Sequence, residues 1–327
     1  MSDDAHYSEV RHEPGHRGRE ADRPGQVPAR GWKDVLVRLK RQVQEDDVAL
    51  LAAGVAFFAL LALVPSLVAL VSIYGLVADP ADVQTTVDDA LSAAPTEVQD
   101  LVSSQLQSVV ESEPSGLRLG VVVGLALALW SASNGMKHLM GALTLAYDET
   151  EGRKFLRLRG LALTLTLGGI VILALALAGM VAPNAIDDSG SEGTLRVALQ
   201  IARWPVLALV AMVTLSLLYR WAPDREAPRF RWASPGAVLA TLVWVAASIG
   251  FSVYTASFGR YNETYGALGA IVIVMLWLYI TAYVVILGAE LNCELERQTV
   301  VDTTSGPARP LGERGAYAAD TLGRSTG

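Results

Sequence analysis

The 327-residue sequence has little charge: 18% of its residues are Asp, Glu, Lys or Arg, whereas 52% are hydrophobic. An ordinary soluble domain carries about 25% charged residues, so this chain has too few to cover a surface that faces water. Its one cysteine, Cys293, excludes an intramolecular disulfide and a zinc site made of thiolates. The net charge of -7 argues against a nucleic-acid-binding protein, because such domains are usually basic.

Residues for catalysis are scarce as well. Three of the four histidines, His6, His12 and His16, lie in the polar N-terminal segment, and the sequence has no phosphate-binding loop. The apolar stretches carry no carboxylate or histidine that could hold a catalytic metal ion. We therefore expect a protein that is not an enzyme and that binds no cofactor or metal.

Long apolar runs dominate what remains. Six stretches of 16 to 31 residues contain no charged residue. A helix needs roughly 20 apolar residues to cross a hydrocarbon core of about 30 Å, and barrel strands would alternate apolar and polar residues instead. The sequence predicts an all-α integral membrane protein with six transmembrane helices. The expected spans cover about residues 48–78, 118–137, 160–183, 200–220, 233–259 and 266–290.

The polar ends of the chain read as disordered tails over 1–30 and 299–327, which leaves a membrane domain over 31–298. No signal peptide is recognisable, so the first span is expected to serve as an uncleaved anchor. A short amphipathic helix is predicted over 32–46, with Lys33, Lys40 and Arg41 away from its apolar stripe. This helix either lies along the anionic inner leaflet or only anchors the topology.

Basic residues predict the orientation. The flank 31–47, the loops after the second and fourth spans, and the flank 291–298 after the sixth contain fourteen Lys and Arg, and the loops on the other side contain four. Basic residues concentrate on the cytoplasmic side of short loops. We expect a multi-pass protein of the inner cell membrane with both termini in the cytoplasm.

One outer loop, over 79–116, is long and acidic, with eight Asp or Glu and no basic residue. Thr96 and Gln99 form a capping box, and apolar residues recur after it at helical spacing. We expect two short amphipathic helices over the outer mouth of the bundle. They form either an acidic lid that attracts cations or a solvated cap without such a role.

A few polar residues enter the predicted spans and are the candidates for a transport path. They are Asn134, His138, Ser248, Ser252, Thr255 and Glu290. The hydroxyls and Asn134 either line a wet path or bond to neighbouring helices. His138 is either a packing residue or a titrating group, and Glu290 either carries a proton or balances Lys137.

Several short motifs, in order along residues 30–298, resemble those of the YihY/BrkB family. They are Ala52–Phe58 with Leu61–Pro65, Leu129–Gly135, Tyr219–Pro223, Pro235–Ala237, Tyr261–Gly269 and Gly288–Asn292. The resemblance implies a six-helix inner-membrane protein associated with envelope integrity or virulence. Family members have been discussed as lipid transporters and exporters, and the family also carries an old ribonuclease BN label.

The resemblance and the residues together favour a lipid or small-solute transporter that contributes to envelope integrity. The alternative is a structural or scaffolding envelope protein without transport activity, and a ribonuclease is disfavoured. Membrane lipids are the expected partners and nucleic acid is not. The sequence leaves the substrate and the oligomeric state open.

Overall fold

The computed structural model describes residues 17–75, 117–185, 193–257 and 267–325. The regular elements of these residues are all helices, and the described part contains no strand apart from one isolated bridge between Pro228 and Thr304. The predicted acidic loop over 79–116 lies outside the described residues. The elements are η1 (Pro24–Gln26), α2 (Ala29–Glu45), α3 (Val48–Gly75), α6 (Leu117–Ala146), α7 (Phe155–Ala185), α8 (Gly193–Trp221), α9 (Phe230–Ser257), α11 (Ala267–Glu296) and α12 (Tyr317–Asp320).

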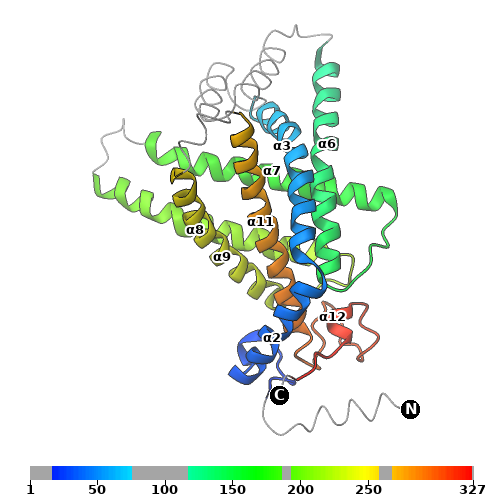
Figure 1. Ribbon diagram of the computed structural model, residues 1–327. Coiled ribbons are helices and arrows are strands. Elements are labelled where there is room, and N and C mark those ends of the chain that lie inside the picture. Colours follow the sequence, from blue (N-terminus) through cyan, green and yellow to red (C-terminus); the bar gives the residue numbers. More distant parts are fainter. Residues whose placement is uncertain (1–16, 76–116, 186–192, 258–266, 326–327) are drawn as a thin grey trace.

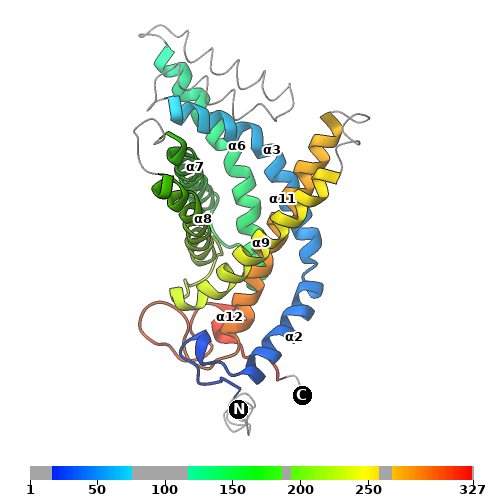
Figure 2. The ribbon, with the colours of Figure 1, turned by 90° about the vertical axis from the view of Figure 1, so that its left-hand side faces the viewer.

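Helix α11 is the centre of the molecule. It packs against α2, α3, α6, α9 and α12, and α3 packs along α6 (Figure 1). The other pair of long helices, α7 and α8, runs across this group at a steep angle, as the two views together show (Figure 2). The last long helix of the sequence therefore connects most of the others.

Small residues allow the central helices to approach closely. A Cβ atom on Gly236 of α9 would lie 2.0 Å from the carbonyl oxygen of Gly288 in α11, so the two helices could not lie this close together with a larger residue at position 236. Gly135 of α6 meets Ala62 of α3 in the same way, at 3.1 Å for an added Cβ. Such small-residue contacts are typical of helix pairs in membranes, where packing rather than water exclusion drives association.

Length and composition identify four described helices that could cross a membrane. They cover Phe155–Ala176, Trp204–Trp221, Phe230–Tyr254 and Ile271–Glu296. A fifth is added if α2 and the first part of α3, which meet at an angle of 61°, count as one broken span. The all-helical membrane character is thus confirmed, while six spans remain a prediction.

Two long helices extend past their predicted spans. Helix α6 continues from the expected end near 137 to Ala146, and α11 continues from 290 to Glu296. The reason is that these extra turns still pack inside the protein: Met140 and Leu143 are fully buried. An apolar run marks the part of a helix that lipid can cover, and the helix itself ends where its packing ends.

Both tails are ordered where they are described, which corrects the expectation of disorder for 17–30 and 299–325. The N-terminal segment pairs with the C-terminal one: the amide of Val300 donates to the Arg19 carbonyl at 2.8 Å, and an Arg19 guanidinium nitrogen donates to the Gly323 carbonyl at 2.7 Å. Together they cover one end of the bundle. We call this the capped end; it comprises residues 17–47, 147–154, 222–229 and 291–325.

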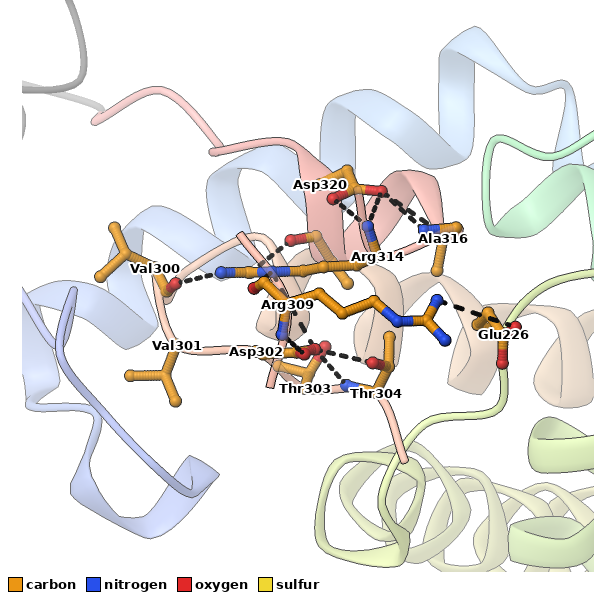
Figure 3. Close-up of polar contacts among 12 residues, drawn as sticks. Glu226, Val300, Val301, Asp302, Thr303, Thr304, Arg309, Arg314, Ala316 and Asp320 are labelled. Atoms are coloured by element: carbon orange, nitrogen blue, oxygen red, sulfur yellow. Dashed lines mark hydrogen bonds and ion pairs between the residues drawn. The ribbon is translucent and has the colours of Figure 1, made fainter. Parts of the chain in front are cut away.

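Side-chain bonds to the backbone fix this polar C-terminal segment (Figure 3). Asp302 accepts from the hydroxyl of Thr304 at 2.7 Å and from the amide of Arg309 at 2.9 Å. The Arg314 guanidinium donates to the carbonyls of Ala319 and Val300, both at 2.7 Å. The polar composition of this segment predicted disorder. The buried side chains of Asp302 and Arg314 hold it in place instead, because they supply hydrogen bonds that buried backbone groups need and that apolar side chains cannot make.

The contact between Gly236 and Gly288 yields a prediction with a matched control. Gly236→Ala forces a methyl group into a backbone oxygen, so we expect a loss of stability of at least about 1–3 kcal/mol, the usual cost of overpacking. Gly250 lies in the same helix, and an added Cβ there would meet no atom within 4 Å. Thermal unfolding of both purified variants should show a lowered midpoint for Gly236→Ala alone; equal midpoints would contradict the close contact.

Candidate functional site

The last turns of α11 and the residues just after it carry polar side chains in a region that water does not reach. The side chains of Glu290, Asn292, Glu294, Glu296 and Gln298 are at most 1% exposed. A buried ionised group is costly unless a partner of opposite charge or hydrogen-bond donors surround it. The partners of these residues therefore define what the capped end can do.

Glu294 lies between two arginines. One of its oxygens pairs with Nε of Arg38 from α2, and the other accepts from Nη1 of Arg297 at 2.7 Å. Arg38 also donates to the Glu294 carbonyl at 3.0 Å and to Oε1 of Gln298 at 2.9 Å, and it reaches the Arg324 carbonyl at 3.1 Å. This arginine thus fastens α2 and the end of the C-terminal segment to α11.

A second buried pair joins the α8–α9 connection to α11. The guanidinium of Arg225 donates to both carboxylate oxygens of Glu296, at 2.7 and 3.1 Å, and both side chains are 0% exposed. The hydroxyl of Thr303 adds a bond to the same carboxylate at 2.7 Å, and the ring of Tyr147 lies 4.6 Å below the guanidinium. Bidentate geometry makes this the best-satisfied ion pair of the capped end.

Neutral groups lock α8 and α9 to α11 in the same region. The amide side chain of Asn292 accepts from the Gly236 backbone amide at 2.7 Å and donates to the Ala233 carbonyl at 3.1 Å. The hydroxyl of Tyr219 donates to the Val285 carbonyl at 2.8 Å. The two Asn292 bonds satisfy backbone groups near Pro235, which interrupts the hydrogen-bond ladder of α9.

Glu290 is the exception. Its side chain is 0% exposed and neither carboxyl oxygen has a hydrogen-bond donor. The charged groups that act on it are other acids: Asp46, Asp148 and Glu294. Lys137, the sequence-based candidate to balance its charge, forms no ion pair with it in the described part of the chain. A fully buried carboxyl group without a donor is the feature that ordinary packing does not explain.

Asp148, just after α6, is part of the same acidic group. Burial raises the pKa of Asp148; Arg297, 3.7 Å away, opposes this, and the carboxylates of Asp46 and Glu294 add to it. The side-chain amide of Gln42 donates to Asp46 at 3.0 Å and to Asp148 at 3.3 Å. One neutral amide thus bridges two carboxylates that would otherwise repel each other.

The other sequence candidates are engaged in packing. Asn134 accepts from Nη1 of Arg159 at 2.7 Å, and the ring of His138 stacks on Phe58 with 3.4 Å between ring centroids. Ser248 donates to the carbonyl of Trp244, four residues earlier, at 2.7 Å.

Ser252 is exposed, and the side chain of Thr255 lies outside the described residues. Among the described contacts, none joins any two of Asn134, His138, Ser248 and Glu290.

Sequence reasoning missed the partners of α11. The sequence does contain a pattern that marks Arg38. Asp34, Arg38 and Gln42 follow one another at four-residue spacing, so they form a polar stripe on the helix that also carries the buried Val35 and Leu39. No comparable local pattern marks Arg225, which lies in a short connection and pairs 71 residues away.

Two short patterns that resemble catalytic motifs lie in the tails. Residues 12–16 read H-E-x-x-H, which binds zinc only on a helix, and Pro14 and Gly15 disfavour a helix there; they lie outside the described residues. Residues 323–327 read G-x-S-x-G, which needs a strand-to-helix turn, and residues 321–325 have neither element. The described residues contain no group of three or more His, Cys, Asp or Glu that could hold a metal ion.

Comparison with known proteins decides the family. The profile of the family described as "Virulence factor BrkB" matches residues 39–311. The chain belongs to the BrkB virulence-factor family. This match confirms the resemblance that the motifs indicated, and it extends into the C-terminal segment of the capped end.

Relatives of this BrkB-family chain carry two kinds of name. It is 33% identical over 256 residues to the ribonuclease-like protein YfkH of Bacillus subtilis, a match that covers 76% of this chain and 90% of that protein. It is 26% identical over 268 residues to a UPF0761 membrane protein of Alteromonas mediterranea, with 80% and 88% covered. No solved structure matches the chain.

The buried pair of Arg225 and Glu296 gives the next prediction. Arg225→Ala leaves Glu296 as an uncompensated buried charge, which should lower stability by about 3–5 kcal/mol. The control is Arg41→Ala: Arg41 pairs with Glu45 at 3.4 Å, but both side chains are more than half exposed, so the expected effect is about 0–1 kcal/mol. Thermal unfolding in detergent would rule out the buried-pair account if both variants lost the same amount.

Proposed function

We propose that this BrkB-family protein is an inner-membrane transporter of a lipid or a small solute and that it contributes to envelope integrity. The observation that carries the proposal is Glu290, an ionisable side chain that is fully buried without a donor at the end of an apolar helix. Ionisable residues within membrane bundles usually serve ion or substrate movement, because burying them only to pack helices is unfavourable.

The outer surface supports contact with lipid. Large apolar side chains of helix α8 are exposed on the surface of the protein, among them Trp204 at 59% and Leu209 at 56%. Contiguous apolar surface of this kind is rare on proteins that face water and normal on those that face acyl chains. Lipid is thus the partner for which the surface of this helix is best suited.

We also propose six spans with both termini in the cytoplasm. The structure brings the basic segments that the charge rule assigns to one side to the same end of the bundle. Arg153 pairs with Asp224 at 3.5 Å across two connections, and Arg225 and Arg297 pair with acids of the capped end. The excess of basic residues then favours the cytoplasm for that end.

Cysteine labelling tests this orientation. In a Cys293→Ala background, single cysteines at Gln84 and Ser104 should react with an impermeant reagent from outside the cell. A cysteine at Ala227, in the α8–α9 connection, should react only after the membrane is permeabilised. The reverse pattern would place the capped end outside and overturn the proposed topology.

Reconstitution tests transport itself. The purified protein should move at least one member of a panel of fluorescent lipids and small solutes across liposome membranes. We expect Glu290→Gln to slow this movement on the order of tenfold, a change of about 1.4 kcal/mol in the barrier. The matched control is Glu313→Gln, which alters an exposed glutamate of the C-terminal segment and should leave the rate unchanged.

The scaffold alternative has its own supporting observation: Asn134, His138 and Ser248 are held by packing contacts. The scaffold alternative would be favoured if folded, correctly inserted protein transported none of the lipids and solutes in the panel.

The word ribonuclease belongs to the name of the Bacillus relative. We propose that this chain is not an enzyme, and its net charge of -7 disfavours an RNA substrate in particular.

A further inference from the structure

The surroundings of Glu290 constrain its protonation state. An ionised carboxylate is an acceptor only, and here both oxygens are buried with no donor. The carboxyl group of Asp46 lies within hydrogen-bonding reach of it. Two carboxylates cannot form a hydrogen bond with each other, but a carboxylic acid and a carboxylate can, because the acid supplies an O–H donor.

The remaining charged groups give an ionised Glu290 no compensation. Asp46 faces it from the α2–α3 junction, Asp148 from the segment after α6, and Cys293 and Glu294 from α11 itself. The nearby cations are engaged elsewhere: Arg38 and Arg297 both bind Glu294, and Arg297 also approaches Asp148. No basic group of the described residues forms an ion pair with Glu290.

We propose that the buried Glu290 carboxyl group carries a proton and donates its O–H to the carboxylate of Asp46, and that this pair is the proton-binding site of the transporter. The inference rests on the proposed function and deepens it by naming the proton as a ligand of the path. The step is a simple dissociation: the O–H bond of Glu290 breaks, the electron pair stays on its oxygen, and the proton passes to water by way of Asp46, which is partly exposed.

The position of the pair couples the proton to the helices. Asp46 lies at the junction where α2 and α3 meet at 61°, and the next residue, Asp47, has a left-handed backbone with φ of 46°. With the proton, the bend is joined to α11 by a hydrogen bond. Without it, two adjacent carboxylates repel each other, and the junction is pushed away from α11.

Infrared spectroscopy of the purified full-length protein tests the proposal. At neutral pH exposed carboxyl groups are ionised, so a carboxylic-acid C=O stretching band reports a buried proton. The wild type should show this band, Glu290→Gln should lose it, and Glu313→Gln should keep it. A wild type without the band, or a folded Glu290→Gln protein that retains it in full, would overturn the proposal.

Asp46→Asn decides the matter if Glu290→Gln does not fold. Replacing the acceptor carboxylate by an amide should shift the band or remove it, and an unchanged band would show that Asp46 is not the partner. The measurement reads protonation without transport, so the two ideas fail separately. If the protein transports but the band is the same in both variants, the proposed function stands and the proton between Glu290 and Asp46 is refuted. If the band changes in the variants but the protein transports nothing, the proton stands and the proposed function is refuted.

Discussion

The end of α11 cannot be buried unless its charges find partners within the protein. Water does not reach Glu294 or Glu296, and an isolated carboxylate in such a place would be far less stable than in solvent. Arg38 pairs with Glu294 and Arg225 pairs with Glu296, and the two arginines come from different parts of the chain. The convergence of α2, the α8–α9 connection and the C-terminal segment at the capped end follows from this one constraint.

The sequence predicted the long helices well, because the thickness of a membrane sets the length of an apolar run. It predicted their ends less well. The extra turns of α6 and α11 contain polar residues, and they remain helical because other segments cover them. The tails show the same limit: Asp302 and Arg314 fix a polar segment through bonds to particular backbone groups, and composition does not reveal such bonds.

The candidate site was partly predictable for the same reason. Glu290 stands out in the sequence as an acid at the end of an apolar helix, whereas its neighbours Asp46 and Asp148 come from distant segments that only the fold brings together. The hydroxyls were the weakest candidates. Thr144, Thr166 and Thr241, like Ser248, donate to the carbonyl four residues earlier, so a hydroxyl in an apolar helix often satisfies itself.

The pairing of Arg38 with Glu294 spans 256 positions of the chain. Arg38 is synthesised first, and the carboxylate that pairs with it follows 256 residues later. A nascent or truncated product therefore carries an arginine, and a helix face built around it, that has nothing to bind. Only a chain synthesised through α11 can form this pair, so the capped end closes late in the folding of the described residues.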